Sequence, residues 1–243
     1  MRTAWIATHT GVVRSRNEDN CCAGTWAADG GDGAWTVDLR GNRWIAAVAD
    51  GMGGHQAGEI ASEITISELI KMADQIEGKT SASEILERVN RKVFQAMFAP
   101  LGRPGMGSTI VGIAFRDEVG LFFNLGDSRA YIVRDTDLVQ TSTDHTIGMG
   151  GDHRTRSHRL TQSLGGTTHR APIFPHVQSE RLAPGDRILL CSDGLTDMIG
   201  SEEILKILSQ NRTHPAQALV SAALNSGGYD NVTVIVIGKL QKC

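Results

Sequence analysis

Acidic side chains stand at the ends of segments that the sequence predicts to be strands. Asp50 follows the apolar run Trp44–Ala49 and precedes a glycine-rich stretch, a pattern typical of a buried strand ending in a tight turn. At such a strand end, the Asp50 carboxylate and the Gly51 carbonyl could both reach one hard cation. An isolated Asp-Gly pair is more often an ordinary turn, so Asp50 alone is only suggestive.

Further acidic groups adjoin other predicted strands. They are Glu18 with Asp19, Asp127, Asp193 and Asp230. Each by itself would be interpreted as a solvated turn residue, but together they favour a shared site. Because the pattern lacks accompanying Cys or clustered His ligands, Mg²⁺ or Mn²⁺ suits it better than softer metals.

Such a carboxylate cluster could support phosphoryl chemistry. Two ions about 3.5–4 Å apart can generate a hydroxide and hold the oxygens of an in-line phosphoryl displacement. The cluster would by itself repel a phosphate group. Arg14 near it would supply a planar, permanently charged fork that matches a phosphate.

The elements that must position these groups mix strands and helices without strict alternation. Runs rich in β-branched and aromatic residues predict strands at Thr3–Thr8, Asn20–Thr25, Trp44–Ala49, Ser108–Arg116, Val119–Leu125, Arg129–Arg134, Val177–Arg181, Arg187–Cys191 and Asn231–Leu240. The glycine-rich segment Ala27–Gly33 should be a loop. Several links between strands are short, which requires antiparallel pairing.

Helical periodicity predicts two pairs of helices. They are Ala57–Asp74, a second running from a cap at Ser81 or Ser83 to Phe98, then Glu202–Gln210 and Pro215–Asn225. In the first helix we expect Ile60, Ile64 and Ile70 to lie on the buried face, which Ile66 and Leu69 widen. In the second, the buried stripe should hold Ile85, Val89, Val93 and Met97. The order favours an α+β fold of antiparallel sheets covered by helix pairs, rather than a doubly wound parallel sheet.

Composition and charge narrow the function classes. With 243 residues and no linker or repeat, we expect one domain over residues 1–243. The net charge of −3, with scattered Lys and Arg, gives no reason to expect nucleic acid as a partner. Apolar runs are too short to span a bilayer and the amino terminus has no secretory pattern, so we expect a cytoplasmic monomer with no membrane contact. The cysteines show no metal-knuckle spacing and should be reduced structural thiols.

Motifs in a fixed order identify a resemblance. The chain carries Arg14…Asn17-Glu18-Asp19, Asp50-Gly51-Met52-Gly53-Gly54-His55…Gly58-Glu59, Gly107-Ser108-Thr109, Gly126-Asp127-Ser128-Arg129, Asp144-His145, Leu160-Thr161-Gln162…Leu164-Gly165, Ser192-Asp193-Gly194-Leu195 and Asp230-Asn231. This set closely resembles the bacterial branch of the metal-dependent Ser/Thr protein phosphatases, the type 2C family. The resemblance covers nearly the whole chain. It implies a four-layer αββα sandwich, with a binuclear metal site at one end of two antiparallel sheets.

The resemblance also implies roles for individual residues. Asp50 would bridge two Mn²⁺ or Mg²⁺ ions, with Asp193 and Asp230 on one ion and Glu18 and the Gly51 carbonyl on the other. Asp127, with Asp193, would help to hold a third, weaker ion. Asp19 would orient the attacking water and Arg14 would hold the substrate phosphate. A hydroxide that bridges the metals would attack phosphorus directly, without a covalent phosphoenzyme.

Two departures from the family pattern affect these roles. Animal relatives carry a histidine, the proposed general acid, where this chain has Met52, which cannot donate a proton. His55 is a candidate substitute, although it could equally cap or pack at the start of the next helix, and a metal-bound water is a third option. The segment of about residues 144–160 is a flap that is longer in bacterial relatives. Arg154, Arg156 and Arg159 in it could contact acidic or phosphorylated substrates, or the segment could be a solvated loop.

The resemblance predicts a phosphatase for phosphoserine and phosphothreonine on proteins, opposing a bacterial eukaryotic-like Ser/Thr kinase. Two alternatives stay open. One is the related branch that dephosphorylates antagonists of anti-sigma factors, against which the presence of Arg14 and Glu18 argues. The other is a non-catalytic binding module of the same fold, which the full set of metal carboxylates disfavours.

Overall fold

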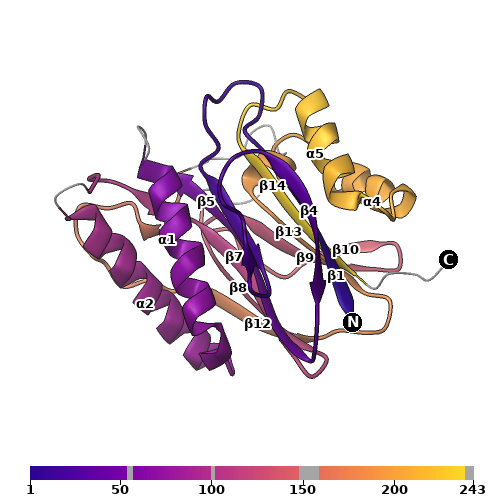
Figure 1. The fold of residues 1–243 in the computed structure, drawn as a ribbon, viewed down its shortest axis with the longest axis horizontal. Coiled ribbons are helices and arrows are strands. Elements are labelled where there is room, and N and C mark those ends of the chain that lie inside the picture. The colour runs from indigo at the N-terminus through magenta and orange to yellow at the C-terminus, as the bar shows by residue number, and fades with distance from the viewer. Residues whose placement is uncertain (54–56, 100–101, 148–158, 239–243) are drawn as a thin grey trace.

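Two antiparallel sheets lie face to face between two groups of helices (Figure 1). The computed structural model describes residues 1–53, 57–99, 102–147 and 159–238. In these residues the first sheet has the strand order β10-β9-β13-β14-β1-β4. Its strands are β1 (Arg2–His9), β4 (Gly33–Leu39), β9 (Arg129–Arg134), β10 (Asp137–Gln140), β13 (Arg187–Cys191) and β14 (Val232–Gly238).

The second sheet follows the order β11-β6-β5-β7-β8-β12, and β2 and β3 extend it beside β5. Its strands are β2 (Asp19–Ala23), β3 (Trp26–Ala27), β5 (Arg43–Met52), β6 (Gly107–Ser108), β7 (Ile110–Arg116), β8 (Val119–Leu125), β11 (Leu164–Gly165) and β12 (His176–Arg181). All the pairings between these strands are antiparallel. The expected α+β fold of two antiparallel sheets is therefore confirmed.

Helices cover the outer face of each sheet. They are α1 (Ala57–Met72), the short 3-10 helix η1 (Ala73–Gln75), α2 (Lys79–Met97), α3 (Asp193–Thr196), α4 (Ser201–Gln210) and α5 (Pro215–Asn225). Figure 1 shows α1 and α2 on one side of the sheets and α4 and α5 on the other. Three buried apolar layers result: one beneath α1 and α2, one between the sheets and one beneath α3–α5.

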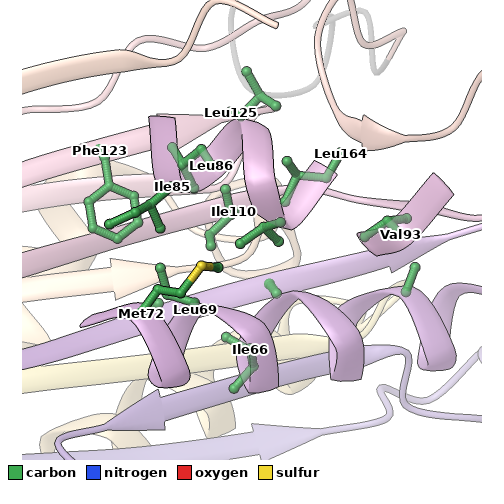
Figure 2. Packing of buried hydrophobic residues seen from close by; sticks show 14 of the residues in the cluster. Ile66, Leu69, Met72, Ile85, Leu86, Val93, Ile110, Phe123, Leu125 and Leu164 are labelled. Carbon is green, nitrogen blue, oxygen red and sulfur yellow. The ribbon is translucent and has the colours of Figure 1, made fainter. Parts of the chain in front are cut away.

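The helices α1 and α2 contribute different kinds of residue to the apolar layer beneath them. On α2 the predicted stripe Ile85, Val89, Val93 and Met97 is buried, and Figure 2 shows Ile85 and Val93 of this stripe in the apolar layer. The prediction for α1 was wrong in part, because Ile60 is 36% exposed, while Ala57, Gly58 and Ala61 are buried with Ile66 and Leu69. Small residues on the inner face let the start of α1 approach β5 closely, and helical periodicity cannot report that approach.

Four strands occur where the sequence predicted none: the short β3 and β11, and the longer β4 and β10. β4 begins at Gly33, the last residue of the expected loop Ala27–Gly33, and pairs with β1 along its whole length. After the turn at Asp135, β10 pairs with β9 at the edge of the first sheet. The bounds of α5 agree with the prediction, and α2 begins earlier, at Lys79, with Ser81 at its third position accepting from the Gly78 N–H. No helix in the described residues is long and apolar enough to cross a membrane.

Candidate metal centre

Asp19 and Asp50 lie directly opposite each other on paired strands. Asp19 begins β2, and the register of β2 with β5 places it against Asp50. Opposed residues of an antiparallel pair point to the same face of the sheet with their Cβ atoms about 5 Å apart. Two carboxylates in that relation repel each other. The sequence places each at a strand end, and the register brings them together.

Glu18 is held against the start of α1 by close backbone contacts. The Gly51 N–H donates to the Glu18 carbonyl oxygen over 3.2 Å, and the Ser62 hydroxyl donates to the same oxygen over 2.6 Å. A Cβ on Gly51 would lie 2.1 Å from the Gly58 carbonyl oxygen, and a Cβ on Gly58 would lie 2.8 Å from the Glu18 carboxylate. Only glycine fits at both positions, which explains the glycines that follow Asp50 and begin the helix.

The first sheet contributes Asp193 and Asp230. Asp193 follows β13 as the first residue of α3, and Asp230 lies two residues before β14. Because β13 and β14 are paired neighbours, these two acidic residues reach the same end of the sandwich. The Ser192 hydroxyl joins the two sheets: it donates to Asp19 Oδ2 over 2.8 Å and accepts from the Thr233 N–H over 2.9 Å.

These carboxylates lie close enough to raise one another's pKa values. Burial raises the pKa of Asp50 well above its usual range, and Asp19, Asp193, Asp127 and Asp230 raise it further. Burial likewise raises the pKa of Asp193, followed by the charges of neighbouring carboxylates. The pKa of Asp19 rises to about 7, first because the side chain is buried. Like charges from both sheets thus converge on Asp50.

This set fits hard divalent cations. Asp19 Oδ1 is buried and has no hydrogen-bond partner, while Oδ2 of the same carboxylate is held by Ser192. A buried carboxylate oxygen without a donor is costly unless a cation or water satisfies it. Within the described ranges, no three Asp, Glu, His or Cys side chains stand close enough to form a ligand set by themselves. Mg²⁺ and Mn²⁺ tolerate this, because they retain several waters beside one or two carboxylates.

Arg14 extends from the loop after β1 to the acidic cluster. Its Nη2 lies 2.7 Å from Asp230 Oδ2, with both side chains about half exposed. The hydrogen bond to Asp230 is the main reason why the pKa of Arg14 is raised, and the charges of Glu18 and Asp50 add to it. Arg14 therefore lies at the cluster, as the sequence predicted, and its fork is engaged by Asp230.

Asp127 is buried just beyond the end of β8 and is fixed by the base of the flap. His145 donates its N–H to the Gly126 carbonyl over 2.9 Å, and its Nδ1 accepts from the Gly126 N–H over 3.1 Å. Next to it, Asp144 accepts three hydrogen bonds from the Arg129 guanidinium. The motifs that contain Asp127 and His145 therefore contact each other, through the two hydrogen bonds between Gly126 and His145.

Asn231 is a site residue whose role the sequence did not indicate. Its side chain is 5% exposed; Oδ1 accepts from the Glu18 N–H over 2.8 Å. Its Nδ2 donates to the Thr10 and Arg16 carbonyls, each over 2.8 Å. Asn231 thus ties the loop that carries Arg14 and Glu18 to the strand that follows Asp230. Asn231 and Ser192 each belong to a motif that carries the family resemblance, beside an acidic strand end, but the motifs assigned no role to either residue.

Several predicted residues lie at or beyond the limits of the description. His55, Arg154 and Arg156 fall outside the described residues. Arg159 is described at the foot of the flap, where its carbonyl accepts from the Ile147 N–H. The Met52 side chain packs against Gly107 and Gly166. A Cβ on either glycine would lie 2.8 Å from Met52 Cε.

Fold and cluster together define a class of protein. Two antiparallel sheets between helix layers, with carboxylates from both sheets at one end, are the framework of a protein whose site suits hard divalent cations.

Comparisons with known proteins identify the family. The family model described as "Protein phosphatase 2C" matches residues 27–226 of this chain. PstP, a serine/threonine protein phosphatase of Mycobacterium tuberculosis, is 32% identical in an alignment of 238 positions that covers 93% of this chain and 43% of that protein. The protein phosphatase PhpP of Streptococcus pneumoniae is 34% identical over 82% of this chain and 87% of its own. The crystal structure of the catalytic domain of a PstP in complex with two manganese ions is 31% identical, with a TM-score of 0.78 over 98% of this chain and 99% of that one.

The chain therefore belongs to the protein phosphatase 2C family of metal-dependent enzymes. It spans less than half the length of the M. tuberculosis PstP that it matches.

Proposed function

We propose that this chain hydrolyses phosphoserine and phosphothreonine on proteins in an Mn²⁺- or Mg²⁺-dependent reaction. The carrying observation is the field of carboxylates from both sheets around Asp50, with the Arg14 guanidinium at its edge. The named activity of the relatives, serine/threonine protein phosphatase, supports the same substrate class.

The carboxylates divide between the ions by their place in the fold. Asp50 faces the acidic groups of both sheets, which suits a bridging ligand. Asp193 and Asp230, from the first sheet, would hold one ion, while Glu18 and the Gly51 carbonyl, adjacent at the start of α1, would hold the other. Asp127 is buried, and its charge helps to raise the pKa of Asp193; it would help to hold a third, weaker ion. When bound, the ions supply an activated water as nucleophile and compensate the charge of the phosphate oxygens.

Asp19 and Arg14 act on the reacting groups. Ser192 donates to one Asp19 oxygen, and the other, Oδ1, is buried without a partner. Oδ1 would therefore be free to accept a hydrogen bond from the attacking water and orient it. With Asp230 engaged as a metal ligand, the Arg14 guanidinium would be available to bind two oxygens of the substrate phosphate with its fork. The same charge that holds the phosphate offsets the repulsion from the carboxylates.

The leaving alkoxide of serine or threonine needs a proton. Met52 has none to give, so we propose His55, three residues further along the chain, as the general acid. Replacing His55 with Ala should slow hydrolysis of an alkyl phosphate more than that of an aryl phosphate, whose leaving group needs little protonation. Equal slowing of both substrates would assign His55 to structure.

Phosphate release from a phosphothreonine peptide tests the proposal. We expect turnover by the native chain with Mn²⁺, none with a chelator, and a loss of at least a hundredfold in Asp50→Asn. Asp38→Asn is the matched control, because Asp38 is an exposed acid on β4, away from the cluster. A folded native chain without metal-dependent turnover would contradict the enzymatic role, and preference for phosphotyrosine would contradict the substrate class.

The cellular setting follows from weaker indications. We propose that residues 1–243 act as one catalytic domain, as a monomer in the cytoplasm, on proteins phosphorylated by a cognate Ser/Thr kinase. Cys21, Cys22 and Cys191 are buried free thiols, which is the usual state in a reducing compartment. Co-purification with a kinase and sedimentation analysis test the partner and the oligomeric state.

A further inference from the structure

Two loops form a single wall beside the candidate metal centre. One follows β1 and the other precedes β14, and they lie side by side at the upper end of the sandwich in Figure 1. The Val12 N–H donates to the Gly228 carbonyl over 2.8 Å, and Arg14 pairs with Asp230. A Cβ on Gly11 would lie 2.4 Å from the Asp230 carbonyl oxygen, so the two backbones are in direct contact.

This wall presents apolar side chains to solvent. Val12, Val13 and Tyr229 are each 64–65% exposed, and we call these three residues the apolar ridge. Two of the side chains rest on backbone: the Tyr229 ring lies against Gly227, and Val12 Cγ2 lies against Gly228. A single exposed apolar residue needs no explanation, but a group of them on two fixed loops indicates a binding surface.

The ridge is continuous with the phosphate site. Val13 directly precedes Arg14, and Tyr229 directly precedes Asp230, so each end of the Arg14–Asp230 pair has an apolar neighbour. An extended peptide advances about 3.3 Å per residue. If the phosphate of a bound protein reaches Arg14, residues one or two positions away must pass over the neighbouring ridge.

We propose that the apolar ridge binds an apolar side chain of the substrate protein next to its phosphorylated residue. The proposal rests on the proposed function and names the sequence class that this site prefers. An apolar neighbour gains burial against Val13 and Tyr229. A charged neighbour would lose hydration there without finding a partner, and an acidic one would also meet the field of the carboxylate cluster.

Paired phosphopeptides test the proposal. Two phosphothreonine peptides differ only in carrying Leu or Ser on both sides of the phosphothreonine, and kcat/KM is measured for each with Mn²⁺. We expect the native chain to favour the Leu peptide about tenfold, the size of effect that burial of an apolar side chain produces. In a variant with Val13→Ser and Tyr229→Ala the ratio should fall to about one, while Tyr229→Phe retains it.

Val119→Ser is the matched control. Val119 is also an exposed valine, but it begins β8, whose other end leads to Asp127, roughly 25 Å away for eight extended residues. This variant should keep the native ratio. Equal turnover of both peptides by the native chain, or an unchanged ratio in the ridge variant, would overturn the proposal. Failure of the native chain on both peptides and on an aryl phosphate would instead contradict the proposed function itself.

Discussion

Removal of the Asn231 side chain should loosen the loop that carries Arg14 and Glu18. The Asn231 amide makes three hydrogen bonds to backbone groups of that loop, each 2.8 Å long, from a position that is 5% exposed. In Asn231→Ala all three are lost, and the Glu18 N–H is left without this acceptor. The loop would then depend on the Arg14–Asp230 ion pair and the Val12–Gly228 hydrogen bond for its position.

The magnitude follows from the three bonds. A buried hydrogen bond contributes about 1 kcal/mol net, so Asn231→Ala should lower the free energy of unfolding by about 3 kcal/mol. For a chain of this size, a loss of that amount corresponds to a fall in Tm of about 6–12 °C. Because Asn231 positions Glu18 without contacting the ions, the apparent Kd for Mn²⁺ should also rise by about tenfold or more.

Urea unfolding with a chelator measures the stability change, and titration calorimetry with Mn²⁺ measures the affinity change. Asn42→Ala is the control: Asn42 is exposed, and its amide reaches only the exposed Asp117 carboxylate, so its effect should stay within about 0.5 kcal/mol. Asn231→Asp, which keeps the acceptor and loses both donors, should also be destabilised. A change below about 1 kcal/mol in Asn231→Ala, or unchanged Mn²⁺ affinity, would refute the assignment of Asn231 as the clamp of this loop.

Three further outcomes are expected. Because folding raises the pKa of Asp19 to about 7 from an ordinary value near 4, the folded state holds the proton longer than the unfolded chain. The chelated protein should therefore lose stability as pH rises from about 4 to about 7. The loss should be smaller in Asp19→Asn, where the raised pKa values of Asp50 and Asp193 still contribute, and calorimetry should find that Mn²⁺ raises Tm more at pH 8 than at pH 5. Gly51→Ala should lose metal-dependent turnover and unfold at lower urea concentration, since its Cβ would overlap the Gly58 carbonyl oxygen at 2.1 Å; native-like stability would contradict that contact. Iodoacetamide should leave phosphatase activity intact, because burial raises the pKa of the Cys21, Cys22 and Cys191 thiols, and peptide mapping that found these three alkylated in active protein would disagree.

Local patterns were sufficient for most of the elements. The β-branched and aromatic residues of Val119–Leu125 and Arg129–Arg134 predicted strands that the structure has with the same bounds. The proline at the start and the glycine after the end fixed the limits of α5. In β4 the period-two signal of Trp35, Val37 and Leu39 was present in the sequence, but the glycines before it favoured a loop.

Sequence alone could not decide which face of α1 is buried. Apolar residues, alanines included, occur around most of the helix, so periodicity is ambiguous, and the outcome depends on how close α1 comes to β5. In the structure the inner face carries Ala57, Gly58 and Ala61 near the metal end. Gly58 lies there against Gly51 and Glu18, so the demands of the site and of the packing coincide.

The amino-acid sequence by itself determined which groups could do the chemistry: acidic residues at strand ends, glycines where the backbone must turn, and an arginine suited to phosphate. These depend on residue type and on neighbours along the chain. Only the tertiary structure decided that Asp19 opposes Asp50, that Ser192 holds one Asp19 oxygen and that Asn231 ties two distant loops together. Such contacts join residues up to about two hundred positions apart, and they follow from strand register and sheet packing, which no local pattern encodes.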